Sequence, residues 1–123
     1  MKVRTSACAL LFLLGSYSRE IRSVEASSTV AVEIEVRADS SNVLHAQVRV
    51  AEGMNARDLM EKLFQMEYVD SGKKFVAGIA GFKAPPREKK FWRLEVDGTA
   101  AQVGIAEIVI KRAMRLRWVI MAY

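Results

Sequence analysis

The chain has 123 residues, with 19 Lys or Arg against 14 Asp or Glu, so its formal net charge is +5. This length gives room for one domain, and so small a charge is not the concentrated basic stripe of a nucleic-acid-binding protein. The single cysteine, Cys8, lies near the start, so a disulfide framework and a thiolate zinc site are excluded for the rest of the chain.

Residues 1–26 have the order of a secretory signal peptide. Basic residues precede an apolar run over 7–14, and small and polar residues follow it. The run is much shorter than the ~20 apolar residues that a membrane-spanning helix needs, so we expect no transmembrane span after signal cleavage. Cleavage after Ser18 and cleavage after Ala26 both fit the small-residue preference. We therefore expect a secreted or extracytoplasmic domain over 29–123.

The domain begins with a predicted hairpin and a helix. Apolar and polar residues alternate over 29–37 and again over 43–50, and the turn residues of 38–42 separate the two runs. Asn55 can cap a following helix, and Asp58 places a carboxylate in its positive first turn. The helix ends before a glycine at position 72, and its apolar stripe consists of Leu59, Met60, Leu63 and Phe64.

The sequence of the second half of the chain predicts several short strands. A strand is expected over about 75–79, and 83–90 is a loop because its two prolines cannot continue a strand ladder. Strand alternation resumes from Phe91, and the Asp97-Gly98 pair is a strong two-residue hairpin signal. A short extended piece follows over 105–112, and a last alternating strand runs from there to the end of the sequence.

The order strand, strand, helix and three or four strands predicts an α+β fold. We expect a β-grasp-like architecture, which is a mixed β-sheet with one amphipathic helix packed across one face. The residues that face inward in this arrangement define one predicted core, made of Val30, Val32, Ile34, Val36, Val48, Val50, Leu59, Leu63, Phe64, Leu94, Val96, Leu116 and Trp118.

No catalytic arrangement is apparent in the sequence. His45 is the only histidine and falls on the wet face of a strand, so neither a metal site nor a Ser-His-Asp triad can be assembled around it. Glu33 and Glu35 are two apart on a polar strand face, without the apolar pocket that would tune one of them for acid catalysis. We therefore expect a protein that is not an enzyme, with no catalytic residues and no metal ligands.

The order of the segments resembles the C-terminal domain of the transcobalamin and intrinsic factor family. The similarity runs from VEIEVRA through QVRVAEGMNARDLMEKL and IAGF to an FW-x-L motif and a V-G-I-A-E motif, so it covers nearly all of 29–123. In that family the domain is a small β-rich cap that closes over a cobalamin held against a larger helical domain. Stand-alone relatives of the domain are of unknown function.

The resemblance implies a ligand site around the FW segment and the turn that precedes Gly104. We expect cobalamin, or another flat corrinoid-like molecule, to be bound without a covalent link. One small domain buries little of such a ligand, so a second domain or protein would complete the site. Carried over to this chain, the predicted ligand-binding residues are Phe91, Trp92, Leu94, Gln102 and Val103.

Strand alternation gives Phe91 and Trp92 different surroundings. Trp92 shares a face with the apolar residues of its strand, which indicates that its indole packs in the core. Phe91 points to the other face, where it either joins an exposed patch or is covered by the proline-containing loop. The alternative function is therefore a protein-protein or cell-surface interaction, with no small-molecule ligand, through Phe91 and a patch of Val119, Met121 and Tyr123.

Overall fold

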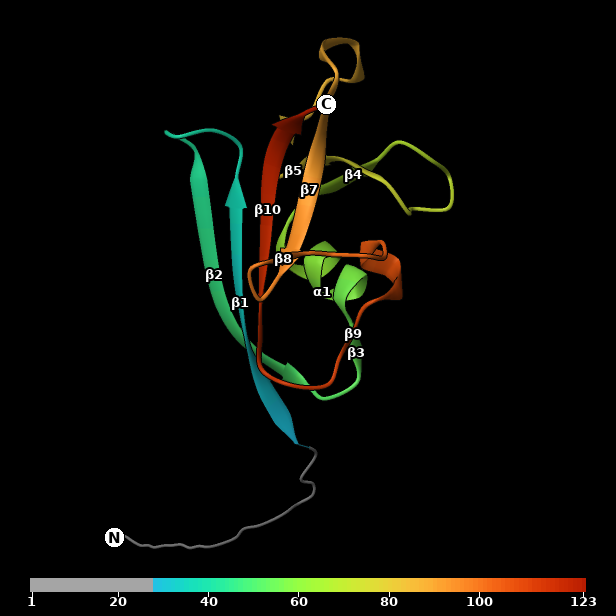
Figure 1. The fold of residues 1–123 in the computed structure, drawn as a ribbon. Helices are drawn as coiled ribbons and strands as arrows, with labels where there is room; N and C mark the ends of the chain where they lie inside the picture. Colours follow the sequence, from blue (N-terminus) through green and yellow to red (C-terminus); the bar gives the residue numbers. More distant parts are fainter. Residues whose placement is uncertain (1–27) are drawn as a thin grey trace, which may run out of the picture.

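The structure is a computed structural model that describes residues 28–123 (Figure 1). The predicted signal peptide lies outside the described residues. Within residues 28–123, no helix is long and apolar enough to cross a membrane.

A mixed five-stranded sheet forms the largest part of the domain, with the strand order β2-β1-β10-β7-β8. Strands β1 and β10 run parallel to each other, and the other neighbouring strands run antiparallel. The two long strands β1 and β2 therefore form the predicted hairpin, and the last strand inserts between β1 and β7. The strands are β1 (Thr29–Arg37), β2 (Val43–Ala51), β7 (Lys90–Val96), β8 (Thr99–Ala100) and β10 (Met114–Ala122).

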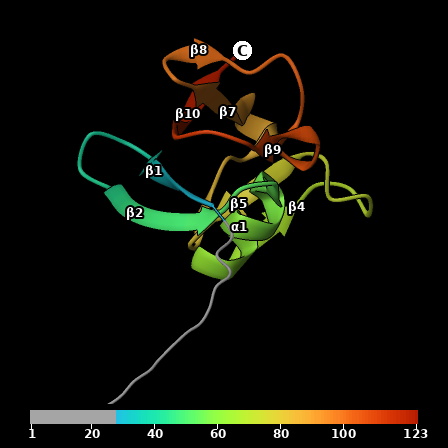
Figure 2. The ribbon, with the colours of Figure 1, turned by 90° about the horizontal axis from the view of Figure 1, so that it is seen from below.

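The remaining elements lie on one side of this sheet, while the β1–β2 hairpin extends to one side of the helix (Figure 2). Helix α1 spans Ala56–Leu63. The small strands form a two-stranded sheet, β3 (Met54–Asn55) with β9 (Val109–Ile110), and a three-stranded sheet, β4 (Met66–Tyr68), β5 (Val76–Ile79) and β6 (Phe82–Lys83). Two 3-10 turns, η2 (Pro86–Glu88) and η3 (Ile105–Glu107), precede β7 and β9. The expected α+β class is confirmed.

The start of α1 follows from its capping residue. Asn55 has an extended backbone, and its side-chain oxygen accepts hydrogen bonds from the backbone N–H groups of Arg57 (2.9 Å) and Asp58 (3.2 Å). These bonds satisfy two of the N–H groups that a helix start leaves without partners. The amide nitrogen of Asn55 also donates to the carbonyl oxygen of Ala106, at 2.9 Å. The predicted cap therefore also ties the helix to η3.

Most of the predicted core is confirmed, with one correction at Leu63. That side chain is 37% exposed, because the helix has only eight residues and the chain turns extended at Phe64. The buried apolar stripe of α1 therefore ends at Met60, one turn earlier than the spacing of its apolar residues predicts. Phe64, Val30, Val48 and Val96 are only partly buried. Trp92, whose indole was expected in the core, and Met60 of the helix stripe are also buried, and the core further contains residues that the prediction did not include, namely Ala56, Ile79, Ala84, Ile105 and Ile110.

In the second half the predicted turn is confirmed, the strand over about 75–79 is confirmed to within one residue, and the extended piece over 105–112 is confirmed only in part. Asp97 and Gly98 both have positive φ, at 51° and 86°, as the predicted two-residue hairpin requires. The strand expected from residue 75 begins at Val76, and Phe75 is 65% exposed. The expected extended piece from residue 105 begins with the 3-10 turn η3, so only Val109–Ile110 pair as a strand.

Candidate functional site

Strand β7 separates the two adjacent aromatic residues of the FW motif. Trp92 is 7% exposed and belongs to the core, whereas Phe91 is 40% exposed on the opposite face. Their cross-strand partners on β10 are Ile120 and Met121, respectively. Side chains of successive strand residues point to opposite faces, so the alternation predicted from the sequence is confirmed here.

A groove of about 690 Å³ runs along the far edge of β7. This volume lies within the usual range for small-molecule sites. One wall is the strand itself over 90–94, and the other consists of the 100–105 segment and residues of the 69–76 loop. All five residues predicted to bind a ligand line this groove: Phe91, Trp92, Leu94, Gln102 and Val103.

Aromatic side chains give the groove its chemical character. Five aromatic residues line it, which include both tryptophans of the chain. Flat aromatic surfaces of this kind suit a flat, largely apolar ligand. The aromatic lining residues are Phe75, Phe91, Trp92, Trp118 and Tyr123.

The backbone of β7 adds polar groups to the groove. Bonds from Tyr123 N–H to the Lys89 carbonyl and from Asp97 N–H to the Arg115 carbonyl, both 2.9 Å, flank the β7–β10 ladder. In an antiparallel ladder every second residue bonds to the neighbouring strand, so odd-numbered residues of β7 bond to β10 and even-numbered ones point away from it. Trp92 is even-numbered. No backbone hydrogen bond joins its N–H or C=O to another of residues 28–123, and the ladder parity directs both groups away from β10, toward the side where the groove lies.

The groove exists because β8 is short. The Ala101 N–H donates to the Leu94 carbonyl at 2.9 Å, and the chain then leaves the edge of β7. It approaches the 69–76 loop so closely that a Cβ on Gly104 would lie 3.3 Å from the Lys74 carbonyl oxygen. This contact is tight, so a side chain at position 104 would require the neighbouring backbone to move by a few tenths of an ångström.

The 69–76 loop is the part of the site that sequence reasoning missed. The carboxylate of Asp70 accepts hydrogen bonds from the backbone N–H groups of Phe75 (3.0 Å) and Lys74 (3.0 Å). The bond from Phe75 is the main cause that lowers the pKa of Asp70 below its ordinary value. Asp70 at a turn was a usable signal, because Asp side chains commonly bond backbone groups a few residues ahead. No pattern in the sequence places this loop beside β7.

The indole N–H groups of Trp92 and Trp118 have no hydrogen-bond partner within the described residues. Both residues line the groove and both are more than nine-tenths buried. A buried donor without an acceptor costs on the order of 1–3 kcal/mol, and buried tryptophans usually find a partner. Within residues 28–123, both indole N–H groups are therefore buried donors without an acceptor, on residues that also line the groove.

The predicted interaction patch is assembled at one end of the opposite sheet face. The Phe91 and Tyr123 rings lie with their centroids 5.7 Å apart and tilted by 57°. Met121 is directly opposite Phe91 on β10, and Val119 is the next residue on that face. Tyr123 is 73% exposed, so the proline-containing loop does not cover the patch. Phe91 and Tyr123 belong to both the patch and the groove, whereas Val119 and Met121 belong to the patch alone.

The rest of this face carries a ladder of ion pairs. Arg117 donates to Glu35 and to Glu95, both at 3.1 Å, and Arg37 donates to Glu35 at 3.0 Å. Arg93 lies 3.2 Å from Glu95, within ion-pair distance but without hydrogen-bond geometry. Burial raises the pKa of Glu35, but the hydrogen bonds from Arg117 and Arg37 outweigh it and lower that pKa below its ordinary value.

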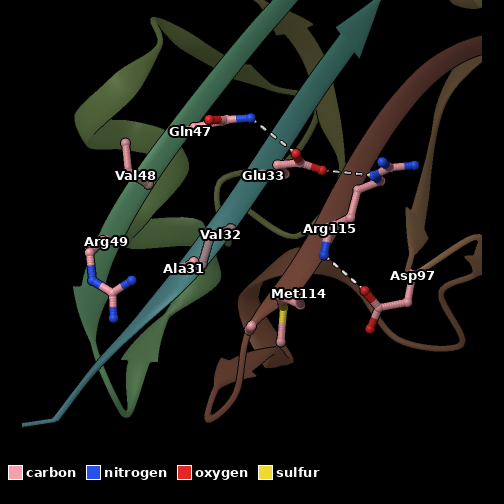
Figure 3. Close-up of a pocket in the computed structure, with 10 residues that line it drawn as sticks. Ala31, Val32, Glu33, Gln47, Val48, Arg49, Asp97, Met114 and Arg115 are labelled. Atoms are coloured by element: carbon pink, nitrogen blue, oxygen red, sulfur yellow. Dashed lines mark hydrogen bonds and ion pairs between the residues drawn. The ribbon is translucent and has the colours of Figure 1, made fainter.

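A second hollow, of about 620 Å³, lies at the other end of the sheet (Figure 3). The Glu33 carboxylate accepts from Gln47 and from Arg115, both at 3.1 Å, and the Arg115 backbone N–H donates to Asp97 at 2.9 Å. Arg49 donates to the hydroxyl and carbonyl of Thr29. These charged groups already have partners, so the hollow offers a ligand less than the groove does.

The described residues contain no group of three His, Cys, Asp or Glu side chains placed to hold a metal ion. His45 lies on β2, exposed on the sheet face, with Glu35 as its cross-strand neighbour on β1. The candidate site among the described residues consists of aromatic side chains and backbone groups.

Solved structures with this fold include binding proteins. Haptocorrin in complex with Cbi has a TM-score of 0.66 and 22% identity, over 82% of this chain and 27% of haptocorrin. The chain thus spans about a quarter of haptocorrin's length. A "putative metal binding protein" from Ruminococcus gnavus ATCC 29149 has a TM-score of 0.63 and 9% identity, over 76% of this chain and 98% of that one. Both similarities are at the level of fold.

No curated protein matches the chain. The similarity to haptocorrin supports the expected transcobalamin-like relation as a relation of fold. A family model matches residues 53–121, from the turn before α1 to the last strand, which is more than half of the chain. The protein belongs to the family described as Domain of unknown function (DUF4430).

Proposed function

We propose that the domain, residues 29–123, is a secreted, non-enzymatic binding module whose groove contacts a flat, largely apolar ligand such as a corrinoid. The observation that carries the proposal is the groove itself, because it gathers all five residues expected at a ligand and adds a wall of exposed aromatic rings. The β-grasp reading of the fold is part of this proposal. It is supported by the strand order, in which β10 lies between β1 and β7 with β1 parallel to it.

The chemistry of the groove fits a corrinoid. Such a molecule is a broad ring with amide arms, so it needs flat apolar contacts together with hydrogen-bond donors and acceptors at the rim. Phe75, Phe91 and Tyr123 provide the exposed apolar contacts. The N–H and C=O of Trp92 provide a donor and an acceptor on a fixed strand, and backbone groups on rigid elements fix the orientation of a ligand.

One wall cannot enclose such a ligand. The groove is open to solvent, and haptocorrin, in which a similar fold is about a quarter of the chain, holds its Cbi within a much longer protein. A site that buries only one side of a ligand leaves much of the apolar surface in water and so binds weakly. We therefore propose that a second domain or protein completes the site.

The experiment uses the two tryptophans as reporters, because both line the groove and the chain has no others. Cobinamide and cobalamin are titrated into the purified protein, and tryptophan emission is followed together with the visible spectrum of the corrinoid. We expect saturable quenching with a dissociation constant of about 10 µM to 1 mM, which is the weak range expected for half a site. No saturable change up to millimolar ligand would sink the proposal.

Two variants separate the groove from the patch. Val103 lines the groove, is not part of the patch and is 47% exposed, whereas Met121 is part of the patch, does not line the groove and is 38% exposed. Neither Val103→Ser nor Met121→Ser should unfold the protein, because substitutions at exposed sites usually change stability by less than ~0.5 kcal/mol. A corrinoid bound in the groove predicts weaker binding for Val103→Ser and unchanged binding for Met121→Ser.

The patch itself favours a second candidate function, which is a protein-protein or cell-surface contact. Exposed aromatic and Met side chains gathered at one end of a charged sheet face are typical of a contact surface. A partner protein bound there predicts the reverse pattern, in which Met121→Ser weakens the interaction and Val103→Ser does not. The corrinoid titration then gives no signal with either variant.

A further inference from the structure

The outer edge of β2 is long and regular, and no segment of residues 28–123 covers it. Strand β2 spans nine residues and forms the border of the five-stranded sheet, with β1 as its one neighbour there (Figure 1). Its pairing with β1 continues without a bulge from Ala51 to Val43. The view from below also shows open space beyond β2 (Figure 2).

Soluble proteins usually protect such an edge. The common devices are very short edge strands, charged side chains or proline on the edge, and bulges that twist it away. The opposite edge of this sheet uses the first device, because β8 has only two residues. Strand β2, with the sequence VLHAQVRVA, has nine residues, no proline, no bulge and one charged side chain, Arg49, which donates to Thr29 of β1. An unprotected edge of this length indicates a surface that pairs with another strand.

The direction of the free backbone groups follows from the flanking bonds. The Ala38 N–H donates to the Asn42 carbonyl and the Glu52 N–H donates to the Ser28 carbonyl, both at 3.0 Å. Both bonds lie in the same register as the β1–β2 ladder, so even-numbered residues of β2 bond to β1. The N–H and C=O groups of the odd-numbered residues of β2 therefore point outward. These residues are Val43, His45, Gln47, Arg49 and Ala51.

We propose that two copies of the chain pair antiparallel through their β2 edges, around a twofold axis at Ala46, to form one ten-stranded sheet. In this register His45 is hydrogen-bonded to Gln47 of the partner subunit, and Val43 to Arg49 of the partner subunit. The symmetry repeats each pair, so the interface contains about eight backbone hydrogen bonds, two for each bonded pair.

The inner face of β2 specifies this register. Leu44, Ala46 and Val48 are each only partly buried within one copy, so part of their apolar surface remains in contact with water. With the axis at Ala46, Ala46 meets its own copy and Leu44 meets Val48 of the partner subunit. Cross-strand apolar pairs of this kind stabilise a sheet, so pairing removes apolar surface from water on both subunits.

The polar face of β2 disfavours the neighbouring register, in which the twofold axis lies at Gln47. An axis at Gln47 also aligns the outward backbone groups, but it places His45 opposite Arg49 of the partner subunit twice. That arrangement places two basic side-chain types directly opposite each other at two positions. With the axis at Ala46, His45 lies opposite an uncharged amide instead. A shift of one residue in a strand pairing would exchange inner and outer faces, and the apolar stripe forbids it.

The first test is sedimentation equilibrium of the purified protein from about 1 µM to about 1 mM, with three chains compared. We expect a reversible dimer for the unchanged protein and for His45→Ala, which keeps the backbone N–H. We expect a monomer for His45→Pro, because proline removes an outward donor from each copy while the bonds to β1 remain. Circular dichroism confirms that each variant is folded. A monomer throughout the range for the unchanged protein overturns the proposal.

The second test fixes the register and does not depend on a proline. In a Cys8→Ser background, Ala46→Cys places two thiols directly across the proposed axis, within the distance that a disulfide bridges. Val48→Cys is the matched control, because its copy lies about four residues away along the strand pair. We expect air oxidation to cross-link Ala46→Cys and not Val48→Cys. Cross-linking of neither variant, or of both equally, refutes this pairing.

Discussion

Replacing Trp92 and Phe91 one at a time tests whether the two side chains lie on opposite faces of β7, one buried and one exposed. Trp92 is 7% exposed, so Trp92→Ala removes a nearly fully buried side chain and leaves a cavity beneath the groove. The cost expected for such a truncation is about 3–5 kcal/mol. Phe91 is 40% exposed and contacts the Tyr123 ring at 5.7 Å. Phe91→Ala should cost about 1 kcal/mol, the value of one aromatic pair.

The two variants are compared by urea unfolding followed by circular dichroism. A domain of this size has a total stability of about 5–15 kcal/mol, so Trp92→Ala should lose a large fraction of it and unfold at a much lower urea concentration. Phe91→Ala should shift the midpoint slightly at an unchanged slope. Trp92→Phe should cost less than the alanine variant, because it retains ring volume and removes a buried N–H that has no acceptor. Equal destabilisation by Phe91→Ala and Trp92→Ala would refute the assigned faces.

Three further predictions concern the fold around the site. Asn55→Ala should cost about 1–2 kcal/mol in thermal unfolding through loss of the helix cap, and Asn55→Asp should cost less because it keeps the cap and loses only the bond to Ala106. Gly98→Ala should cost about 1–2 kcal/mol from its φ of 86° alone, since a Cβ there meets no atom within 4 Å. The pKa of Glu35 is lower in the folded protein than its ordinary value of 4.5. Its ion pairs therefore stabilise the fold fully at pH values above 4.5, and this stabilisation is lost as the pH falls through the lower pKa of the folded state. Arg117→Met should therefore flatten the acid limb of the pH-stability profile, and an unchanged limb would contradict the assigned pairs.

The parts of the fold that the sequence predicts well are those with a local cause. The β1–β2 hairpin follows from the alternation of apolar and polar residues, the start of α1 from Asn55, and the tight turn from Asp97 and Gly98. In each case the physical reason lies within a few neighbouring residues. The division of Phe91 from Trp92 is of the same kind, because strand alternation alone determines it.

The parts that the sequence does not predict depend on contacts between distant segments. The end of α1 at Leu63 is set by the change to extended backbone at Phe64, which follows no capping signal in the sequence. Ile79, Ile105 and Ile110 are buried although each belongs to a short, irregular segment without a clear period. Short segments of this kind are buried by tertiary packing, and their burial cannot be read from propensity or periodicity.

The candidate site shows how these two kinds of information combine. The lining residues of β7 and of the 100–105 segment were expected from a resemblance, but a groove requires a second wall, and the 69–76 loop supplies it. The early end of β8 separates that wall from β7, and the missing side chain of Gly104 lets the 100–105 segment approach Lys74 closely. A longer β8 would pair with the backbone of Trp92 and fill the groove. The open edge of β7 is thus the structural condition for binding there, and lengthening β8 should abolish binding while stabilising the sheet.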